Sequence, residues 1–235
     1  MTNTINTNKE TQASGLGFLF YIKWVISWVW PLVIEVDTSA TPELEIVLTH
    51  GKKQLHTRVA NYSYGNLELA FRRCFEEVSL DWEGCRDVLM LGFGVGSVAH
   101  LVKARNPSVN ITGVELDQRI IDWYGNHFDI VDGAEVVCAD ASQYVQDVKT
   151  TFDLIIVDLY QDLDVPKEFE QMGFLSRLNE LITPGGAMIF NKVSISEQQK
   201  EEFGDLLLKC SELFNEVTTN EQLGMNRFIV AKRPK

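Results

Sequence analysis

The sequence predicts an α/β fold: a sheet of mostly parallel strands, a C-terminal antiparallel hairpin and a small β-hairpin domain at the N-terminus. Four apolar stretches of strand length each end in a turn or a carboxylate, and helical patterns separate them. Near the C-terminus, two strand patterns flank a tight turn at Gly224, which predicts the closing hairpin. An alternating apolar and polar pattern around Gly51 predicts the N-terminal hairpin.

Composition limits the class of protein and of partner. At 235 residues with 45% hydrophobic residues, the chain suits one α/β domain with a small appendage. The formal net charge of -12 argues against nucleic acid as a partner, because phosphate backbones are bound by clustered Lys and Arg, and none cluster here. A small-molecule acceptor fits better. The cysteines and histidines lack metal-ligand or redox spacing, so we expect no metal site, and reduced core cysteines in a cytoplasmic protein.

The chain divides into three predicted parts. Residues 1–14 are rich in Thr and Asn and are expected to form a disordered tail. Residues 15–65 are predicted to hold a helix and a small antiparallel sheet, which combines a strand over residues 32–36 with the hairpin. Residues 66–235 are predicted to form the parallel-sheet domain.

The apolar run over residues 16–34 is the most ambiguous part of the sequence. It is long enough to cross a membrane, but Lys23 interrupts it and Pro31 would end a helix. We therefore expect a short amphipathic helix followed by a strand. The apolar face of residues 16–30 is expected to dock on the domain, to pair with a second subunit in a homodimer, or to contact a membrane surface. The sequence leaves these alternatives open.

The stretch Val88–Ser97 is the centre of the predicted parallel-sheet domain. A buried strand there breaks into Gly92, Gly94 and Gly96 before a helical pattern begins. Glycine allows a positive φ, and it allows a ligand to lie against the main chain with no Cβ between them. The stretch therefore predicts either a nucleotide-binding turn or a merely tight strand-to-helix turn.

An acidic residue follows each of the next three predicted strands. Glu115 lies at the end of the second strand, where it can accept both hydroxyls of a ribose. Asp140 ends the third strand and Asp158 the fourth, where a carboxylate can orient an amine and take its proton. Because the carboxyl ends of parallel strands share one edge, we expect these groups beside the glycine turn. Each has a structural alternative, since all three positions also suit capping of the turn or helix that follows.

A nicotinamide dehydrogenase also has a glycine turn and an acidic second strand, but its fingerprint expects glycine at Ser97. From about Pro31 to its C-terminus, the chain instead resembles the spermidine synthase (polyamine aminopropyltransferase) family, within the Rossmann-like class I methyltransferase fold. The motifs that carry the resemblance are Gly51-Lys52-Lys53-Gln54, Leu91-Gly92-Phe93-Gly94-Val95-Gly96, Val114-Glu115-Leu116-Asp117, Ala139-Asp140-Ala141 and Phe152-Asp153-Leu154-Ile155-Ile156-Val157-Asp158.

The resemblance implies a cofactor, either S-adenosylmethionine or its decarboxylated form, and a role for each motif. Glu115 would hold the ribose hydroxyls, Asp140 the adenine amino group, and the glycine turn the sulfonium side chain. Asp158 matches the family's catalytic aspartate, and Tyr160 lies beside it as a second catalytic candidate. The cofactor-binding residues implied in this way are Gln54, Gly92, Phe93, Gly94, Gly96, Glu115, Leu116, Asp140 and Ala141.

Three departures from the family pattern concern the amine side of the site. Val95 stands where the family has the aspartate that meets the aminopropyl amine. The loop Asp158–Asp162 replaces Asp-Ser-Ser-Asp-Pro, and Tyr64-Gly65-Asn66 is the nearest match to a Tyr-X-Glu motif. We therefore expect an adenosyl-sulfonium-dependent transferase that acts on a small, amine-bearing acceptor. The alternatives are an orthodox spermidine synthase and a catalytically silent nucleoside-binding interaction protein.

Overall fold

The computed structural model describes residues 21–40, 42–57, 65–160 and 165–233. The chain forms two compact units, Met1–Tyr62 and Ser63–Lys235, and each is described by itself. The predicted tail over residues 1–14 lies outside the described residues.

The first unit contains a helix over residues 21–26 and a three-stranded antiparallel sheet in the order β1-β2-β3. Ser27 joins the two, because its hydroxyl donates to the Trp24 carbonyl and accepts the Gly51 N–H at 3.0 Å. Trp28 and Trp30 are 54% and 71% exposed. Within the described part of the chain, no helix has the length and apolarity needed to cross a membrane. The strands are β1 (Leu32–Asp37), β2 (Leu44–Thr49) and β3 (Lys52–Thr57).

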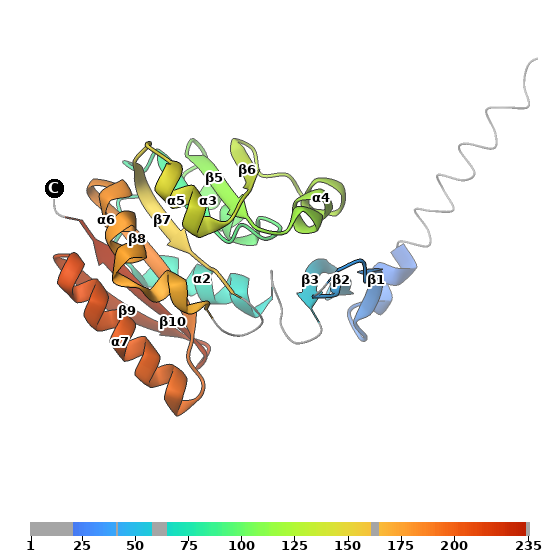
Figure 1. Ribbon diagram of the computed structural model, residues 1–235. Helices are drawn as coiled ribbons and strands as arrows, with labels where there is room; N and C mark the ends of the chain where they lie inside the picture. Colours follow the sequence, from blue (N-terminus) through green and yellow to red (C-terminus); the bar gives the residue numbers. More distant parts are fainter. Residues whose placement is uncertain (1–20, 41, 58–64, 161–164, 234–235) are drawn as a thin grey trace, which may run out of the picture. The chain divides into compact units, whose positions relative to one another are not determined.

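The second unit is built on a seven-stranded sheet in the order β6-β5-β4-β7-β8-β10-β9 (Figure 1). β4 to β8 are parallel, while β10 lies between β8 and β9 and is antiparallel to both. This confirms the predicted fold class. The strands are β4 (Asp87–Leu91), β5 (Asn110–Glu115), β6 (Ala134–Cys138), β7 (Phe152–Val157), β8 (Ile182–Val193), β9 (Glu216–Gln222) and β10 (Asn226–Lys232).

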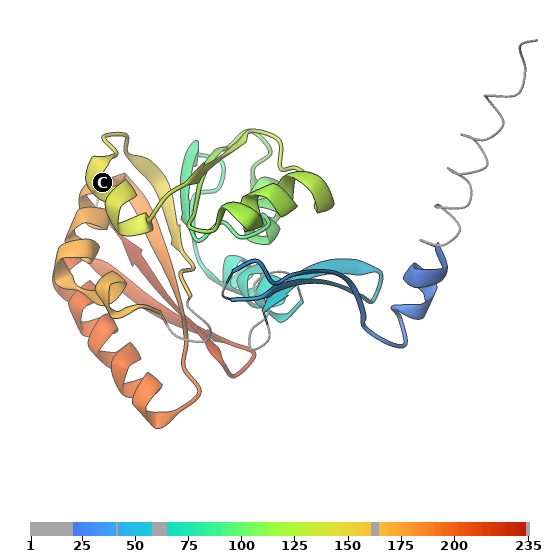
Figure 2. The same ribbon diagram turned by 45° about the vertical axis from the view of Figure 1, so that its right-hand side comes forward.

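Helices cover both faces of this sheet, as Figure 2 shows, with α2, α3 and α4 on one face and α5, α6 and α7 on the other. β6 ends at Cys138, two residues before its predicted end at Asp140, because Asp140 already caps α5. The helices are α2 (Asn66–Glu77), α3 (Ser97–Arg105), α4 (Gln118–His127), α5 (Ala141–Asp147), the 3-10 helix η1 (Lys167–Glu170), α6 (Met172–Leu181) and α7 (Glu197–Leu213).

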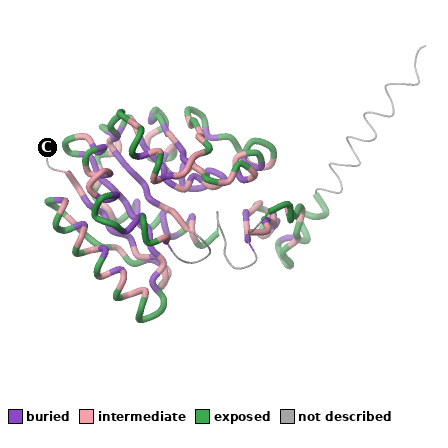
Figure 3. Tube along the Cα trace, viewed as in Figure 1, coloured by how far each residue is buried: buried purple, intermediate pink, exposed green. Residues whose placement is uncertain are grey.

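The core lies on both faces of the central strands, which are buried along most of their length (Figure 3). On one face, Phe190 of β8 packs in a cluster with residues of α5, α6 and α7. On the other, the ring of Phe71 in α2 lies 4.9 Å from that of Phe228 in β10. Cys138 at the end of β6 is exposed and so departs from the expected core position, whereas the other cysteines, Cys74, Cys85 and Cys210, are buried.

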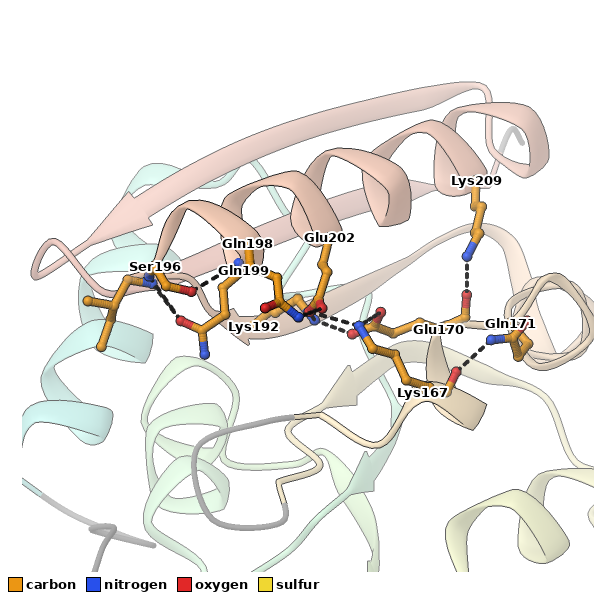
Figure 4. A network of polar contacts seen from close by, with 10 residues as sticks. Lys167, Glu170, Gln171, Lys192, Ser196, Gln198, Gln199, Glu202 and Lys209 are labelled. Carbon is orange, nitrogen blue, oxygen red and sulfur yellow. Dashed lines mark hydrogen bonds and ion pairs between the residues drawn. The ribbon is translucent and has the colours of Figure 1, made fainter.

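A buried ion-pair network joins β8 to η1 and α7 (Figure 4). Lys192 is 3% exposed and pairs with Glu170, which is also buried. Glu202 of α7 lies 3.4 Å from the Lys192 ammonium and 2.8 Å from that of Lys167. Lys209 donates to the Glu170 carbonyl at 3.0 Å. The network therefore fixes η1 against β8 and α7.

We expect Lys192→Met to lower the free energy of unfolding by about 3 kcal/mol, because it leaves the buried Glu170 carboxylate with only the mostly exposed Lys167 ammonium, 3.6 Å away, as a compensating charge. Urea unfolding measures this change. Lys200→Met, which removes the exposed pair with Glu197, is the control and should leave the midpoint nearly unchanged. Glu170→Leu added to Lys192→Met should restore stability. If the double variant were no more stable than Lys192→Met, the loss would not come from the unpaired charge.

Candidate functional site

The carboxyl ends of β4, β5, β6 and β7 meet at one edge of the larger sheet. The N–H groups of Gly92 and Phe93 both donate to the Val114 carbonyl, at 2.9 and 3.0 Å. On the other side of β4, the Asp158 N–H donates to the Leu91 carbonyl at 2.8 Å. The turn after β4 therefore lies between the ends of β5 and β7, at one edge of the sheet.

The glycine turn needs glycine for two different reasons. Gly92, Gly94 and Gly96 all have positive φ, of 85°, 57° and 83°. In addition, a Cβ on Gly92 would lie only 2.1 Å from the carbonyl oxygen of Asp158. The first glycine thus brings the turn against the main chain that carries Asp158, and the third is the N-cap of α3.

Glu115 is held beside this turn by three backbone donors. Its Oε2 accepts the Gly94 N–H at 2.9 Å, and its Oε1 accepts those of Leu116 and Asp117 at 2.9 and 3.1 Å. Burial raises the pKa of Glu115, and these hydrogen bonds oppose the rise. A carboxylate offers about four acceptor positions. One remains, so accepting both hydroxyls of a ribose would displace one backbone donor.

Asp140 serves as the N-cap of α5, which is the structural alternative weighed from sequence. Its Oδ1 accepts the Ser142 N–H at 2.8 Å, the Ser142 hydroxyl at 2.5 Å and the Gln143 N–H at 3.1 Å. The hydrogen bond from the Ser142 side chain is the main cause of its lowered pKa. Within the described chain these bonds all fall on Oδ1, which leaves Oδ2 as an acceptor for an amino group.

The other predicted cofactor-binding residues occupy different environments. The Phe93 ring is in the core, 5.1 Å from the Tyr124 ring, so only its main chain lies at the turn. Leu116 is 69% exposed and Ala141 is buried at the start of α5. Gln54 lies in β3 of the first unit, and its role stays a prediction.

Asp158 and Tyr160 are the predicted catalytic pair. The Asp158 Oδ1 accepts a hydrogen bond from Asn191 Nδ2 at 2.9 Å. Burial raises the pKa of Asp158 to about 7, and the nearby charge of Glu115 contributes to the rise. The Tyr160 hydroxyl is buried beside the main chain of Val193, and burial and the charge of Asp158 raise its pKa. A carboxyl that titrates near neutral pH suits proton transfer.

Asn191 is a site residue that the sequence reading missed. It lies in an apolar strand, is fully buried, and reaches Asp158 from 33 residues further along the chain. Its only sequence signal is a polar amide within a strand pattern that is otherwise buried.

The spermine/spermidine synthase domain matches residues 75–223, more than half of the chain. The chain belongs to the spermine/spermidine synthase family. The matched region contains the glycine turn, Glu115, Asp140 and Asp158, so the predicted family is confirmed.

Individual relatives in and around the family are transferases by name. The probable polyamine aminopropyl transferase of Bifidobacterium longum is 32% identical over 155 residues, which cover 65% of this chain and 35% of the relative. The chain thus spans about a third of that protein's length. The name of this relative agrees with the predicted enzyme class.

Two solved structures share the fold. A spermidine synthase in complex with the transition state analogue AdoDATO superimposes with a TM-score of 0.67 at 17% identity, over 86% of this chain and 72% of that chain. Human methyltransferase-like protein 13 in complex with SAH superimposes with a TM-score of 0.57 at 23% identity, over 71% of this chain and 78% of that chain. The fold is therefore shared by a spermidine synthase and a methyltransferase-like protein.

We expect Asp158→Asn to stabilise the chain, and to do so more at pH 8 than at pH 5. Folding raises the pKa of Asp158 to about 7, so the wild-type chain loses stability as pH rises from the unfolded value near 4 through 7. The amide carries no charge at any pH. Its stabilising effect should therefore grow by on the order of 2–3 kcal/mol between pH 5 and pH 8.

Urea unfolding at the two pH values measures this difference. Asp205→Asn, on the exposed surface of α7, is the matched control. An equal effect of Asp158→Asn at both pH values would show that the Asp158 carboxyl does not titrate in this range.

Proposed function

We propose that the chain is a transferase that binds an adenosyl sulfonium donor at the carboxyl edge of the larger sheet and moves a group to a small, amine-bearing acceptor. The observation that carries this proposal is the placement of the Glu115 carboxylate, 2.9 Å from the Gly94 N–H and on the opposite side of the glycine turn from Asp158. The turn and Glu115 suit a ribose and a sulfonium side chain, and Asp158 suits the acceptor.

Group transfer from a sulfonium donor to an amine requires alignment of the reacting atoms and removal of a proton from the amine. The amine nitrogen attacks the carbon bonded to sulfur, the carbon–sulfur bond breaks, and sulfur keeps the electron pair as a neutral thioether. Because charge disappears from the donor, a desolvated pocket and in-line alignment favour the step. The amine must give up a proton, and Asp158 is the group we assign to accept it.

The identity of the donor depends on the residue at the centre of the turn. Val95 is fully buried and apolar, at the place where the family pattern has an aspartate. Decarboxylated S-adenosylmethionine carries an ammonium with no carboxylate beside it, so it needs an anionic partner more than S-adenosylmethionine does. Val95 therefore favours S-adenosylmethionine and methyl transfer. The 32% identity to a probable polyamine aminopropyl transferase favours the alternative, orthodox spermidine synthesis.

We expect isothermal titration calorimetry to show binding of S-adenosylhomocysteine or methylthioadenosine, and Glu115→Ala to weaken it by at least tenfold. Loss of charge-assisted hydrogen bonds to ribose, about 1.5–3 kcal/mol each, accounts for this loss. Glu135→Ala, on the exposed side of neighbouring β6, is the control. Absence of heat from every adenosyl thioether would contradict the proposed function.

We expect mass spectrometry of reactions with each donor and a panel of amines to separate the two chemistries. Methyl transfer adds one methyl group to an amine only with S-adenosylmethionine. Aminopropyl transfer to putrescine, seen only with decarboxylated S-adenosylmethionine, would instead identify an orthodox spermidine synthase. Binding of adenosyl thioethers without any product would favour an interaction protein, for which the exposed Tyr21, Trp28 and Trp30 offer a surface.

A further inference from the structure

Two buried asparagines form a chain that leads to the Asp158 carboxylate. Asn191 of β8 and Asn226 of β10 are 0% and 5% exposed, although their strands are otherwise mostly apolar. Asn191 lies opposite Phe228, which packs under α2, and Asn226 is two residues from Phe228 along β10. Residues two apart on a strand share a face, so the two amides lie on the same face of the sheet.

The two hydrogen bonds that link these side chains are both donated toward Asp158. Asn226 Nδ2 donates to Asn191 Oδ1 at 3.2 Å, and Asn191 Nδ2 donates to Asp158 Oδ1 at 2.9 Å. A primary amide has a donor end and an acceptor end. With the Asn226 Nδ2 group at the acceptor end of Asn191, the donor end of Asn191 faces Asp158.

We propose that Asn226 fixes the amide orientation of Asn191, and that the two act as positioning residues which hold Asp158 Oδ1 and leave Oδ2 to receive a proton. The role of this arrangement in catalysis rests on the proposed function. Its effect on the protonation and orientation of Asp158 can be measured without a substrate.

The groups around Asp158 explain why the orientation of the Asn191 amide affects the protonation of Asp158. Burial and the charge of Glu115 from β5 both raise the pKa of Asp158, while the hydrogen bond from Asn191 of β8 opposes the rise. Tyr160, the other titratable group that faces Asp158, is buried and neutral. If the amide chain were reversed, Asn191 would present its oxygen, and Asp158 would have to keep its proton in order to donate. A protonated Asp158 cannot accept the proton of an amine.

The first test uses the wild-type chain, labelled with ¹³C-aspartate and ¹⁵N-asparagine. The Asp158 carboxyl resonance, assigned by its loss in Asp158→Asn, gives the pKa directly by NMR. We expect the side-chain NH₂ resonances of Asn191 and Asn226 to shift with the same midpoint, because each hydrogen bond polarises the next. An Asn226 resonance that does not follow this midpoint would contradict the proposed hydrogen-bond chain from Asn226 through Asn191 to Asp158.

The second test separates orientation from packing. Asn191→Leu should raise the pKa of Asp158 by about one unit, and Asn226→Leu, which does not touch Asp158, by about half as much. Gln222→Leu is the matched control, because Gln222 lies opposite Asn226 in β9, is 5% exposed, and bonds to Asn220 instead. It should leave the pKa of Asp158 unchanged.

The outcomes distinguish the two proposals. An unchanged Asp158 pKa in folded Asn226→Leu would overturn the positioning role of Asn226, whatever the chain catalyses. If that variant does not fold, the common midpoint in the wild-type chain still decides the question. Conversely, the expected shifts together with an absence of adenosyl ligand binding would overturn the proposed function and leave the amide chain intact.

Discussion

The close approach of Gly92 to the main chain of Asp158 is the constraint on which the candidate site depends. A side chain on Gly92 would collide with the Asp158 carbonyl, so only glycine lets β4 turn between the ends of β5 and β7. This turn brings the Gly94 N–H to Glu115 and places Asp158 on the other side. The Glu115 and Asp158 residues therefore lie on either side of one glycine turn.

The carboxylates of the site also hold the fold. Asp140 caps α5, which is the structural role that the sequence suggested as its alternative, whereas Glu115 accepts three backbone N–H groups and leaves the capping of α4 to Asp117. The structural and the ligand-binding role are compatible at Asp140, because its Oδ2 is left as an acceptor. At Glu115 the two roles compete. A ligand that takes an oxygen from Glu115 competes with a backbone donor, and part of its binding free energy is spent on that exchange.

The sequence predicts the parts of this site whose signal is local. The glycine turn, the acidic strand ends and the strand and helix periods all lie within short windows. The fold class and the sheet edge that carries the site can therefore be predicted from the sequence. The amide chain and the ion pairs cannot be predicted in this way. Asn191 meets Asp158, and Lys192 meets Glu170, across 33 and 22 residues of chain. The amide chain depends on strand order, on β8 lying beside β7 for Asp158 and on β10 lying beside β8 for Asn226, which no local pattern states.

Neighbouring residues of β8 divide between the two faces of the sheet, and this links the site to the surrounding fold. Asn191 points to the face of α2 and holds Asp158, while Lys192 points to the opposite face and holds Glu170 of η1. Asp158 follows β7, and Glu170 is the last residue of η1. One strand therefore holds both residues, through an uncharged donor at the Asp158 carboxylate and an ion pair at Glu170. Because burial and, to a lesser extent, the charge of Glu115 raise the pKa of Asp158, a cation in place of Asn191 would oppose that rise and remove the near-neutral titration on which the proposed proton transfer depends.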